Sequence, residues 1–346
     1  MQRYGKPSLP LLKHKRNFFE ENDEILAEQK RVLKLYAAQP RRSQCKNCHC
    51  KLQEIAFSKL GIDYLICPNC GHLNGGHEDT DAFVAQLYIN ADSKSLASVY
   101  RVEDIEAYQR RVADIYLPKI DFLIEALREE GLSPLDLSYA DLGAGSGYLV
   151  QAFLSRGAEK AIGYEVSLSQ VAFANAMIPG ERIRLHSLDE ISEIAKALCA
   201  DVVTLIGVLQ HLRHPELLLR SLQENANVRY LYFSVPIFSP CIFFEMVFSS
   251  VMQRQLSGGH THLYTESSID WFCNKFGFKR VAEWWFGTDM FDLYRSIGVS
   301  LRQAPETGSM CERWWEIMKS AIDEMQLALD RRRLSSEVHM LVKLKR

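Results

Sequence analysis

The stretch Asp141-Leu142-Gly143-Ala144-Gly145-Ser146-Gly147 decides the fold that the sequence predicts. It follows an apolar run and precedes a segment, 147–156, whose apolar residues recur at helical spacing. Glycines between a strand and a helix allow a tight turn and a close approach of the backbone to a ligand. The free N–H groups at the start of the helix then face a polar group of that ligand. The stretch therefore predicts a ligand loop in an α/β domain.

The alternation of strand and helix continues beyond this loop. The expected strands are 137–142, 161–166, 182–186, 201–208, 228–235, 279–285 and 337–345, and the expected helices are 103–130, 147–156, one from about 169, 191–198, 215–224 and 267–276. Such alternation is typical of a mostly parallel sheet with helices on both faces. We therefore expect a Rossmann-like α/β fold with seven strands, interrupted before the last strand by a helical insertion at 287–335.

The chain of 346 residues is long for one domain, and its sequence divides into four regions. We expect a charged, solvated helical arm at 1–43, a small cysteine-bearing module at 44–80, a linker and helical cover at 81–130, and the α/β domain at 131–346. A net charge of −2 excludes a general attraction to nucleic acid. No signal peptide is recognisable, and the apolar run 236–252 is too short and too interrupted to span a bilayer. These features predict a cytoplasmic protein without a transmembrane segment.

A carboxylate ends the second expected strand, eighteen residues after Gly147. Glu165 at this place can accept hydrogen bonds from both hydroxyl groups of a ribose. A nicotinamide-binding fold would show the same loop and carboxylate, but the G-x-G-x-x-G spacing of dinucleotide folds is missing. Leu188 and Asp189, after the third strand, are placed to meet an adenine ring. The pattern thus favours a different adenosine-containing ligand.

Four motifs in order carry a family resemblance: DLGAGSGYL (141–149), GYEVS (163–167), SLDE (187–190) and GVLQHL (207–212). With these motifs the chain resembles the small-molecule class I methyltransferases that use S-adenosylmethionine (SAM), over about 105–285 and 336–346. The resemblance implies SAM as the cofactor and the strand order 3-2-1-4-5-7-6 with an antiparallel seventh strand. One departure is Gln210, where relatives usually carry glutamate, and it bears on contacts with the acceptor.

The resemblance also implies which residues contact SAM. The loop would hold the methionine part, Glu165 and Ser167 the ribose, and Asp189 the adenine. The full expected set is Asp141, Gly143, Ala144, Gly145, Gly147, Tyr148, Glu165, Val166, Ser167, Leu188, Asp189 and Gly207.

Two cysteine pairs, Cys45-x2-Cys48 and Cys67-x2-Cys70, lie 18 residues apart, which is the spacing of a zinc ribbon. Four thiolates would leave no open position on the ion, so the zinc would be structural and would supply the folding energy of a module too short for a core. The alternative is that the cysteines form a redox pair or disulfides. Disulfides fit the paired spacing and a reducing compartment less well than zinc does. The neighbouring side chains of Cys50, His49, His72 and His77 are expected to be bystanders.

A cysteine-paired zinc module before a SAM domain looks like the sugar C-methyltransferases that build branched deoxysugars, and like bacterial methyltransferases of surface-glycan loci. The segment Leu87-Tyr88-Ile89-Asn90, with Tyr100 and Tyr108, resembles the tyrosine-bearing segment that those enzymes place over the active site. In the same enzymes a histidine in the region after the fifth strand is the expected base.

Candidate groups for the acceptor site lie where the expected strands end, because open α/β sheets bind ligands at that edge. They are His211 after the fourth strand, Glu245 after the fifth, and His260, His262 and Tyr264 in the stretch GGHTHLY (258–264). The two loop histidines would share a face of an extended segment, and either can act as the base or merely fix the loop. His211 is alternatively a packing residue or a wall of the cofactor site. Glu245 could orient a base, bind a sugar hydroxyl or be a salt-bridged helix residue.

The predicted function is methyl transfer from SAM to a small polar acceptor, namely a sugar, nucleotide-sugar or surface glycan. The alternatives are an RNA or protein methyltransferase recruited through the zinc ribbon, and a non-catalytic SAM-binding scaffold. The near-neutral charge and the lack of a D/N-P-P-Y/F motif count against a polymer substrate. The clusters Trp284-Trp285-Phe286 and Trp314-Trp315 fit either core packing or a homodimer contact through the insertion. The sequence leaves open whether oxygen, nitrogen or carbon is methylated.

Overall fold

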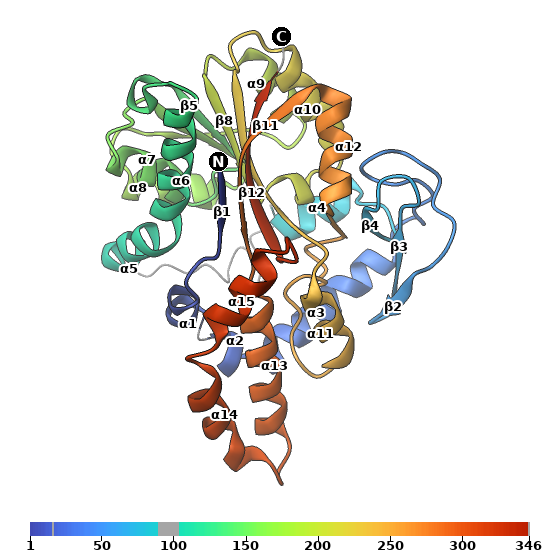
Figure 1. Ribbon diagram of the computed structural model, residues 1–346. Helices are drawn as coiled ribbons and strands as arrows, with labels where there is room; N and C mark the ends of the chain where they lie inside the picture. Colours follow the sequence, from blue (N-terminus) through green and yellow to red (C-terminus); the bar gives the residue numbers. More distant parts are fainter. Residues whose placement is uncertain (16, 89–103, 345–346) are drawn as a thin grey trace.

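The fold centres on a large sheet of eight strands (Figure 1). The computed structural model describes residues 1–15, 17–88 and 104–344. The strands are β1 (Gln2–Tyr4), β5 (Tyr139–Leu142), β6 (Ala161–Glu165), β7 (Ile183–Leu185), β8 (Val202–Ile206), β9 (Tyr230–Pro236), β11 (Phe278–Phe286) and β12 (Glu337–Leu344). Their order is β1-β11-β12-β9-β8-β5-β6-β7, with β12 antiparallel to both of its neighbours. The expected order of seven strands and the antiparallel last strand are confirmed.

The eighth strand, β1, is one that the sequence did not predict. It extends the sheet beyond β11 in parallel orientation. The terminal ammonium of Met1 donates a hydrogen bond to the carbonyl of Val281 at 3.0 Å, and the indole N–H of Trp284 donates to the carbonyl of Gly5 at 2.8 Å. Three residues are too few to show the period-two alternation by which a strand is recognised, so this one was taken for part of the charged arm.

Helices cover both faces of the large sheet, and each face buries its own apolar core. One core lies under α6 (Leu117–Glu129), α7 (Tyr148–Ser155) and α8 (Leu168–Met177), and the other under α9 (Ile191–Ala197), α10 (Pro215–Glu224) and α12 (Glu266–Phe276). Successive side chains of a strand point to opposite faces, so Tyr139 belongs to the first core and Ala140 to the second. The predicted α/β class is confirmed.

The helix expected at 103–130 is divided into three parts. These are α5 (Ile105–Arg111), a π-helical turn (Val112–Tyr116) and α6. Pro118 has no N–H to donate to the preceding turn, so the regular α-helical pattern is interrupted directly before it. The wider turn places Tyr108 and Tyr116 on opposite sides of the same ring, that of Tyr148 beside the glycine loop.

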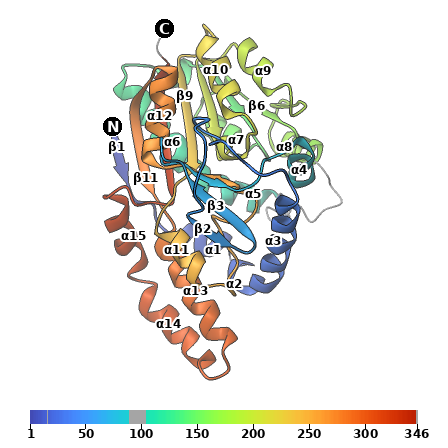
Figure 2. The same ribbon diagram turned by 90° about the vertical axis from the view of Figure 1, so that its right-hand side faces the viewer.

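A second, smaller sheet lies beside the large one and faces the viewer in Figure 2. Its strands are β2 (Phe57–Lys59), β3 (Ile62–Ile66), β4 (Leu73–Gly75) and β10 (His262–Leu263), in the order β10-β4-β3-β2. The first three belong to the expected cysteine module, but β10 comes from the GGHTHLY stretch and pairs antiparallel with β4. The module at 44–80 is therefore not a separate unit, because its sheet is completed by the main domain.

The N-terminal arm is helical, as expected, but one side of its longest helix is buried and not solvated. It forms α1 (Leu9–His14), α2 (Asn17–Glu20) and α3 (Asn22–Ala37). Val32, Leu33 and Tyr36 of α3 are buried in one cluster with the strands of the small sheet. The charged residues of α3 mostly point outward, so the helix is amphipathic, and its acidic and basic side chains concealed an apolar stripe.

The insertion consists of α13 (Asp289–Gln303), α14 (Cys311–Met318) and α15 (Ile322–Asp330), and α13 and α14 extend away from the sheet (Figure 1). The indole N–H of Trp314 donates to the carbonyl of Tyr294 at 2.9 Å, and the ring of Trp315 lies 5.8 Å from that of Phe19. These tryptophans therefore pack within the chain. Two further helices, α4 (Asp81–Tyr88) and α11 (Pro240–Val247), lie near the small sheet. Among the described helices, none combines the length and the apolarity needed to cross a membrane.

Candidate active site

The glycine loop joins β5 to α7 in a conformation that requires glycine. Gly143 and Gly147 have φ angles of 75° and 74°, in the left-handed region. A Cβ atom at Gly143 would lie 2.7 Å from a methyl group of Val208, and one at Gly147 would lie 2.5 Å from the terminal methyl of Ile178. Two segments therefore pack directly against the loop backbone, and any side chain there would push them away.

Two buried carboxylates lie at this loop. Glu165, at the end of β6, accepts hydrogen bonds from the backbone N–H groups of Gly145, Val166 and Ser167 at 2.8, 2.8 and 2.9 Å. Asp141 accepts one from the hydroxyl of Thr204 at 2.5 Å. Burial, helped by the negative charge of Glu165, raises the pKa of Asp141 to about 7. The backbone bonds hold the Glu165 carboxylate at the mouth of the loop.

A cleft of about 800 Å³ opens beside Glu165. Its lining comes from two segments, and the residues are Val166, Ser167, Leu168, Ser169, Ala172, Leu185, His186, Ser187, Leu188 and Glu190. Of the residues expected at the adenine, Leu188 therefore lines the cleft, whereas the exposed Asp189 does not and its neighbour Glu190 does. The side chain of Glu190 accepts a hydrogen bond from the backbone N–H of Ser187 at 2.7 Å, which turns it back toward this loop.

Three tyrosines form a stack over the start of α7. The ring of Tyr148 lies 4.7 Å from that of Tyr108 and 5.0 Å from that of Tyr116, and both pairs are nearly parallel. The hydroxyl of Tyr108 donates to the carbonyl of Ser146 at 3.1 Å. The position of Tyr108 over the loop thus agrees with the expected tyrosine-bearing segment. Tyr116 also belongs to the stack, and the sequence did not single it out. The side chain of Tyr88, together with Ile89, Asn90 and Tyr100, lies outside the described residues.

His211 and His260 face each other at the edge where the parallel strands end. Their ring centroids are 5.2 Å apart, and both side chains are half-buried. His211 is hydrogen-bonded to the backbone of Gly259, and His260 to the backbone of Gln255. Burial lowers the pKa of His260 to about 4, and that of His211 to about 3, where the neighbouring His260 adds to the effect. Both rings are therefore neutral at physiological pH.

The other loop histidine, His262, has different partners. It lies in β10, and its Nδ1 is 2.7 Å from Nε2 of His72 in the cysteine module. Tyr264 packs against both of these rings, at centroid distances of 5.5 and 4.7 Å, and is itself buried. His260 and His262 thus have different protein partners, because one contacts His211 and the other contacts His72 of the small sheet.

Glu245 organises the loop that follows α11. Its carboxylate accepts hydrogen bonds from three successive backbone N–H groups, those of Arg254, Gln255 and Leu256, at 2.6, 2.7 and 2.9 Å. Both carboxylate oxygens are engaged in this way, and the side chain is buried. These contacts favour a role in shaping the segment before His260, which agrees with the alternative that Glu245 orients a base.

Gly207 and Gln210 come from the GVLQHL motif. The N–H of Gly207 donates to the hydroxyl of Ser234 at 3.0 Å, and its φ of 68° again favours glycine. Gln210, which stands where relatives usually carry glutamate, is buried and its Oε1 has no partner among the described residues. A buried polar atom without a partner is costly, and such atoms often mark a place where a ligand binds.

A group of charged residues that the sequence did not single out lies at the same edge. Glu337, the first residue of β12, accepts a hydrogen bond from Nε2 of His339 at 2.8 Å. Burial alone would raise the pKa of Glu337, but the bond from His339 and the charges of Lys119 and Lys6 hold it well below its usual range. Sequence reasoning missed this group because its members come from the arm, from α6 and from the last strand, where each resembles an ordinary surface charge.

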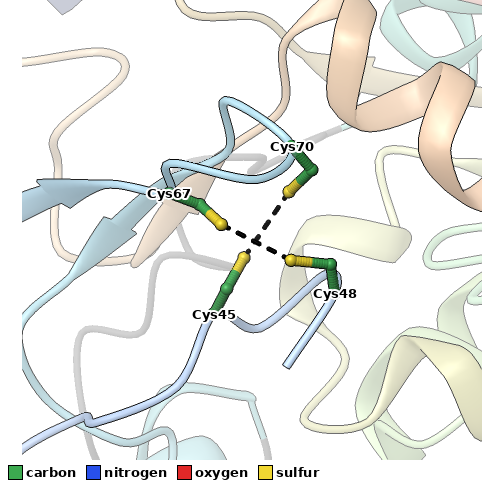
Figure 3. Close-up of side chains that lie close together, drawn as sticks. All are labelled: Cys45, Cys48, Cys67 and Cys70. Carbon is green, nitrogen blue, oxygen red and sulfur yellow. Dashed lines mark hydrogen bonds between the residues drawn. The ribbon is translucent and has the colours of Figure 1, made fainter. Parts of the chain in front are cut away.

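The sulfur atoms of Cys45, Cys48, Cys67 and Cys70 converge on one point (Figure 3). All four lie within 4.8 Å of one another, and the pairs Cys45–Cys70 and Cys48–Cys67 are 3.7 and 3.4 Å apart. A tetrahedral zinc with bonds of about 2.3 Å places its sulfurs roughly 3.8 Å apart. The arrangement therefore fits a four-coordinate zinc ion without movement of the backbone.

The surroundings of the four cysteines also suit thiolates. The side-chain amides of Asn47 and Asn74 point N–H groups at the sulfurs of Cys70 and Cys45, each at 3.6 Å. Such donors stabilise negative charge on sulfur. Cys50 instead directs its thiol to a backbone carbonyl, and it lies outside the four-sulfur group, as the sequence predicts.

Comparison with known proteins agrees with this geometry. Residues 108–283, more than half of the chain, match the family model described as a methyltransferase domain. The chain therefore belongs to the methyltransferase domain family, and with its strand order it is a class I SAM-dependent methyltransferase. No curated protein matches the sequence.

Solved structures of methyltransferases resemble the chain only distantly. Magnesium protoporphyrin IX methyltransferase from Synechocystis PCC 6803, with bound S-adenosylhomocysteine (SAH), is 14% identical over 71% of this chain and 89% of its own, with a TM-score of 0.42. The plantazolicin methyltransferase is 13% identical over 69% and 88%, with a TM-score of 0.43. A SAM-dependent methyltransferase from Anabaena variabilis is 14% identical over 75% and 98%, with a TM-score of 0.40. Similarity at this distance transfers no acceptor to this chain.

Proposed function

We propose that this protein transfers a methyl group from SAM to a small polar acceptor, namely a sugar, a nucleotide-sugar or the end of a surface glycan, with His260 as the proton acceptor. The observation that carries the proposal is the half-buried, neutral His260 facing His211 at the edge where the strands end. His211 follows β8 and comes three residues after Val208, which packs against Gly143, and this supports an acceptor site beside the cofactor loop.

The enclosure of this edge supports a small acceptor. Helices α1 to α3, α11 and α13 to α15 all lie beyond the edge of the sheet at which β12 begins (Figure 1). The small sheet adds a further wall, because β10 ties the loop of His260 to it. Because these elements cover this edge, we expect a small acceptor and not a folded RNA or protein. The sugar class itself rests on the resemblance to sugar C-methyltransferases and is a matter for experiment.

When bound, SAM would supply a methyl group attached to a positively charged sulfur. The acceptor atom would bond to the methyl carbon, and the sulfur would keep the electron pair of the bond that breaks. Nδ1 of His260 takes the proton that the acceptor atom loses. The hydrogen bond from His260 to the backbone of Gln255 fixes the orientation of the ring, and Glu245 fixes that segment in turn. General-base help of this kind contributes about 10²- to 10⁴-fold to a rate.

The residues that would hold SAM are those of the loop and of the cleft beside Glu165. We propose that the Glu165 carboxylate accepts hydrogen bonds from the ribose hydroxyls and that Leu188 packs on the adenine. The backbone of Gly143 and Gly145 would lie against the methionine part. The support is the φ of these glycines, the burial of Glu165 and the cleft that both segments line.

Glu165→Ala is expected to weaken SAH binding roughly 100-fold or more, because charge-assisted hydrogen bonds contribute about 1.5–3 kcal/mol each. Calorimetry on the wild type and the variant measures the effect. Glu159→Ala, an exposed glutamate in the loop before the same strand, serves as the matched control. Equal affinity in the Glu165 variant and the control would exclude the ribose contact.

We further propose that the four cysteines bind a structural zinc ion. The fit of the sulfur geometry, the N–H donors from Asn47 and Asn74, and the absence of room for a fifth ligand among four thiolates support this. The ion would hold both cysteine turns together and, through β4, the strand that carries His262.

The acceptor class is tested by a turnover screen. Purified protein is incubated with SAM and with separate panels of nucleotide-sugars, glycans, RNA and proteins, and mass spectrometry locates the added methyl group. Methylation of a sugar or glycan is the expected result. Incorporation only into RNA or protein would reverse the assignment and favour recruitment of a polymer through the cysteine module. Binding of SAM without any turnover would favour a scaffold.

A further inference from the structure

Two buried histidine rings connect the cysteine module to the acceptor loop. His72 follows the second cysteine pair, and His262 lies in β10, which pairs with β4. Nε2 of His72 is 2.7 Å from Nδ1 of His262, and the two side chains are 0% and 1% exposed. Two nitrogen atoms at this distance share one hydrogen, so one ring donates and the other accepts.

Neighbouring hydrogen bonds decide which ring donates. The hydroxyl of Ser268 donates to the carbonyl of Thr265 at 3.0 Å, so its single hydrogen is already used. Nδ1 of His72, 3.3 Å from this hydroxyl oxygen, must therefore carry the hydrogen and donate to it. A fully buried ring without a carboxylate partner is neutral, so Nε2 of His72 keeps a lone pair. His262 then donates from Nδ1, and its own Nε2 is left with a lone pair.

That lone pair has no use within the described structure. Nε2 of His262 is buried and has no hydrogen-bond partner among residues 1–15, 17–88 and 104–344, and the same is true of Nδ1 of His260 two residues earlier. A buried polar atom left unpaired costs about 1–3 kcal/mol. Both atoms come from the GGHTHLY stretch, and both rings can accept but not donate at these positions. The two unpaired acceptors match a ligand that brings at least two hydrogen-bond donors.

We propose that His72 is a positioning residue that holds His262 in the Nδ1–H form, so that Nε2 of His262 accepts a hydrogen bond from a hydroxyl group of the methyl acceptor. This inference rests on the proposed function and narrows it. One hydroxyl or other proton-bearing group of the acceptor faces His260, and a second hydroxyl faces His262. On this proposal the acceptor carries a second hydroxyl group besides the group that is methylated, and the cysteine module supports its binding through His72.

The tautomer can be measured without any acceptor. Nitrogen-15 NMR of imidazole-labelled protein with bound SAH is expected to show His262 in the Nδ1–H form. In His72→Phe, which keeps an aromatic ring but offers no lone pair, the signals of His262 should shift toward the Nε2–H form. His49→Gln, in the same module but at the surface, is the control. An Nε2–H form in the wild type, or no change in His72→Phe, would overturn the proposal.

A second variant separates positioning from folding. The amide oxygen of His72→Gln can still accept from Nδ1–H, so this variant should keep the wild-type tautomer even if His72→Phe does not fold. With an acceptor found in the screen, KM in His72→Phe should rise roughly tenfold or more, with a smaller change in kcat, while His72→Gln stays near the wild type.

A deoxy analogue of the acceptor completes the test. Its KM in the wild type should be higher than that of the full acceptor by a similar factor. In His72→Phe the two KM values should differ little, because the hydrogen bond to the second hydroxyl is already absent there. Equal losses in both proteins would overturn the contact with His262. Failure of every hydroxylated acceptor in the screen would instead refute the proposed function, and the NMR experiment would still decide the tautomer.

Discussion

Replacing His260 with alanine is expected to lower kcat about 10²- to 10⁴-fold and to leave SAH affinity within about twofold of the wild type. The range is that of general-base catalysis, and the proposed base contacts the acceptor rather than the loop of Gly143 and Gly145. Steady-state kinetics with an acceptor from the screen measures the rate, and calorimetry measures SAH binding. The decisive result is a fall in kcat without a fall in SAH affinity.

The matched control for this variant is His214→Ala. His214 is exposed and lies two residues after the GVLQHL motif. Its Nδ1 is 3.9 Å from the carboxylate of Glu216, which is a weak ion pair. It should retain full activity. A parallel fall in SAH affinity in His260→Ala would mean that the ring supports the cofactor site, and full activity would remove His260 from the mechanism.

Removing the metal from the cysteine module is expected to have the largest effect on stability. Structural zinc sites contribute apparent binding free energies of about 10–16 kcal/mol, and the small sheet has few other apolar contacts around the four sulfurs. Cys67→Ser should bind less than one zinc ion per chain, lose the β4–β10 pairing and lose turnover. SAH binding should persist, because the Glu165 carboxylate is held by the backbone of Gly145, Val166 and Ser167, which all belong to the α/β domain.

Elemental analysis for zinc, circular dichroism and SAH calorimetry test this expectation. Cys50→Ser is the control, since Cys50 stands beside the first pair but outside the four-sulfur group. Full activity of a zinc-free Cys67→Ser protein would refute the structural role. Loss of SAH binding together with zinc would show that the two sites form one cooperative unit.

The sequence predicted the large sheet because strongly periodic segments specify their own structure. Each central strand is a short apolar run followed by a helix, and the glycine loop needs backbone angles that only glycine adopts easily. The cysteine pairs could also be recognised from the sequence, since two C-x2-C pairs at this spacing are typical of a site with four sulfur ligands. What the sequence could not predict was pairing between distant segments. Strand β1 and strand β10 are three and two residues long, and neither carries a recognisable pattern.

The sequence predicted candidate residues for the site, but it did not predict which of them contact one another. His260 and His262 were chosen for their chemistry, and only the fold shows that one contacts His211 and the other His72. The sequence left three roles open for Glu245, and its three backbone hydrogen bonds favour the one in which it orients a base. Glu337 was overlooked because two of the charges that act on it, those of Lys6 and Lys119, come from elements far away in the sequence.

The pairing of β10 with β4 has a consequence for how this protein can change over time. Two stretches nearly two hundred residues apart share one ladder, from His262 opposite Asn74 to Leu263 opposite Leu73. A one-residue insertion or deletion in either stretch would turn every later side chain of that strand to the opposite face. We therefore expect lengths in the two stretches to vary together among descendants of a common ancestor. A cysteine module grafted from a relative should function only if its matching acceptor loop is transferred with it.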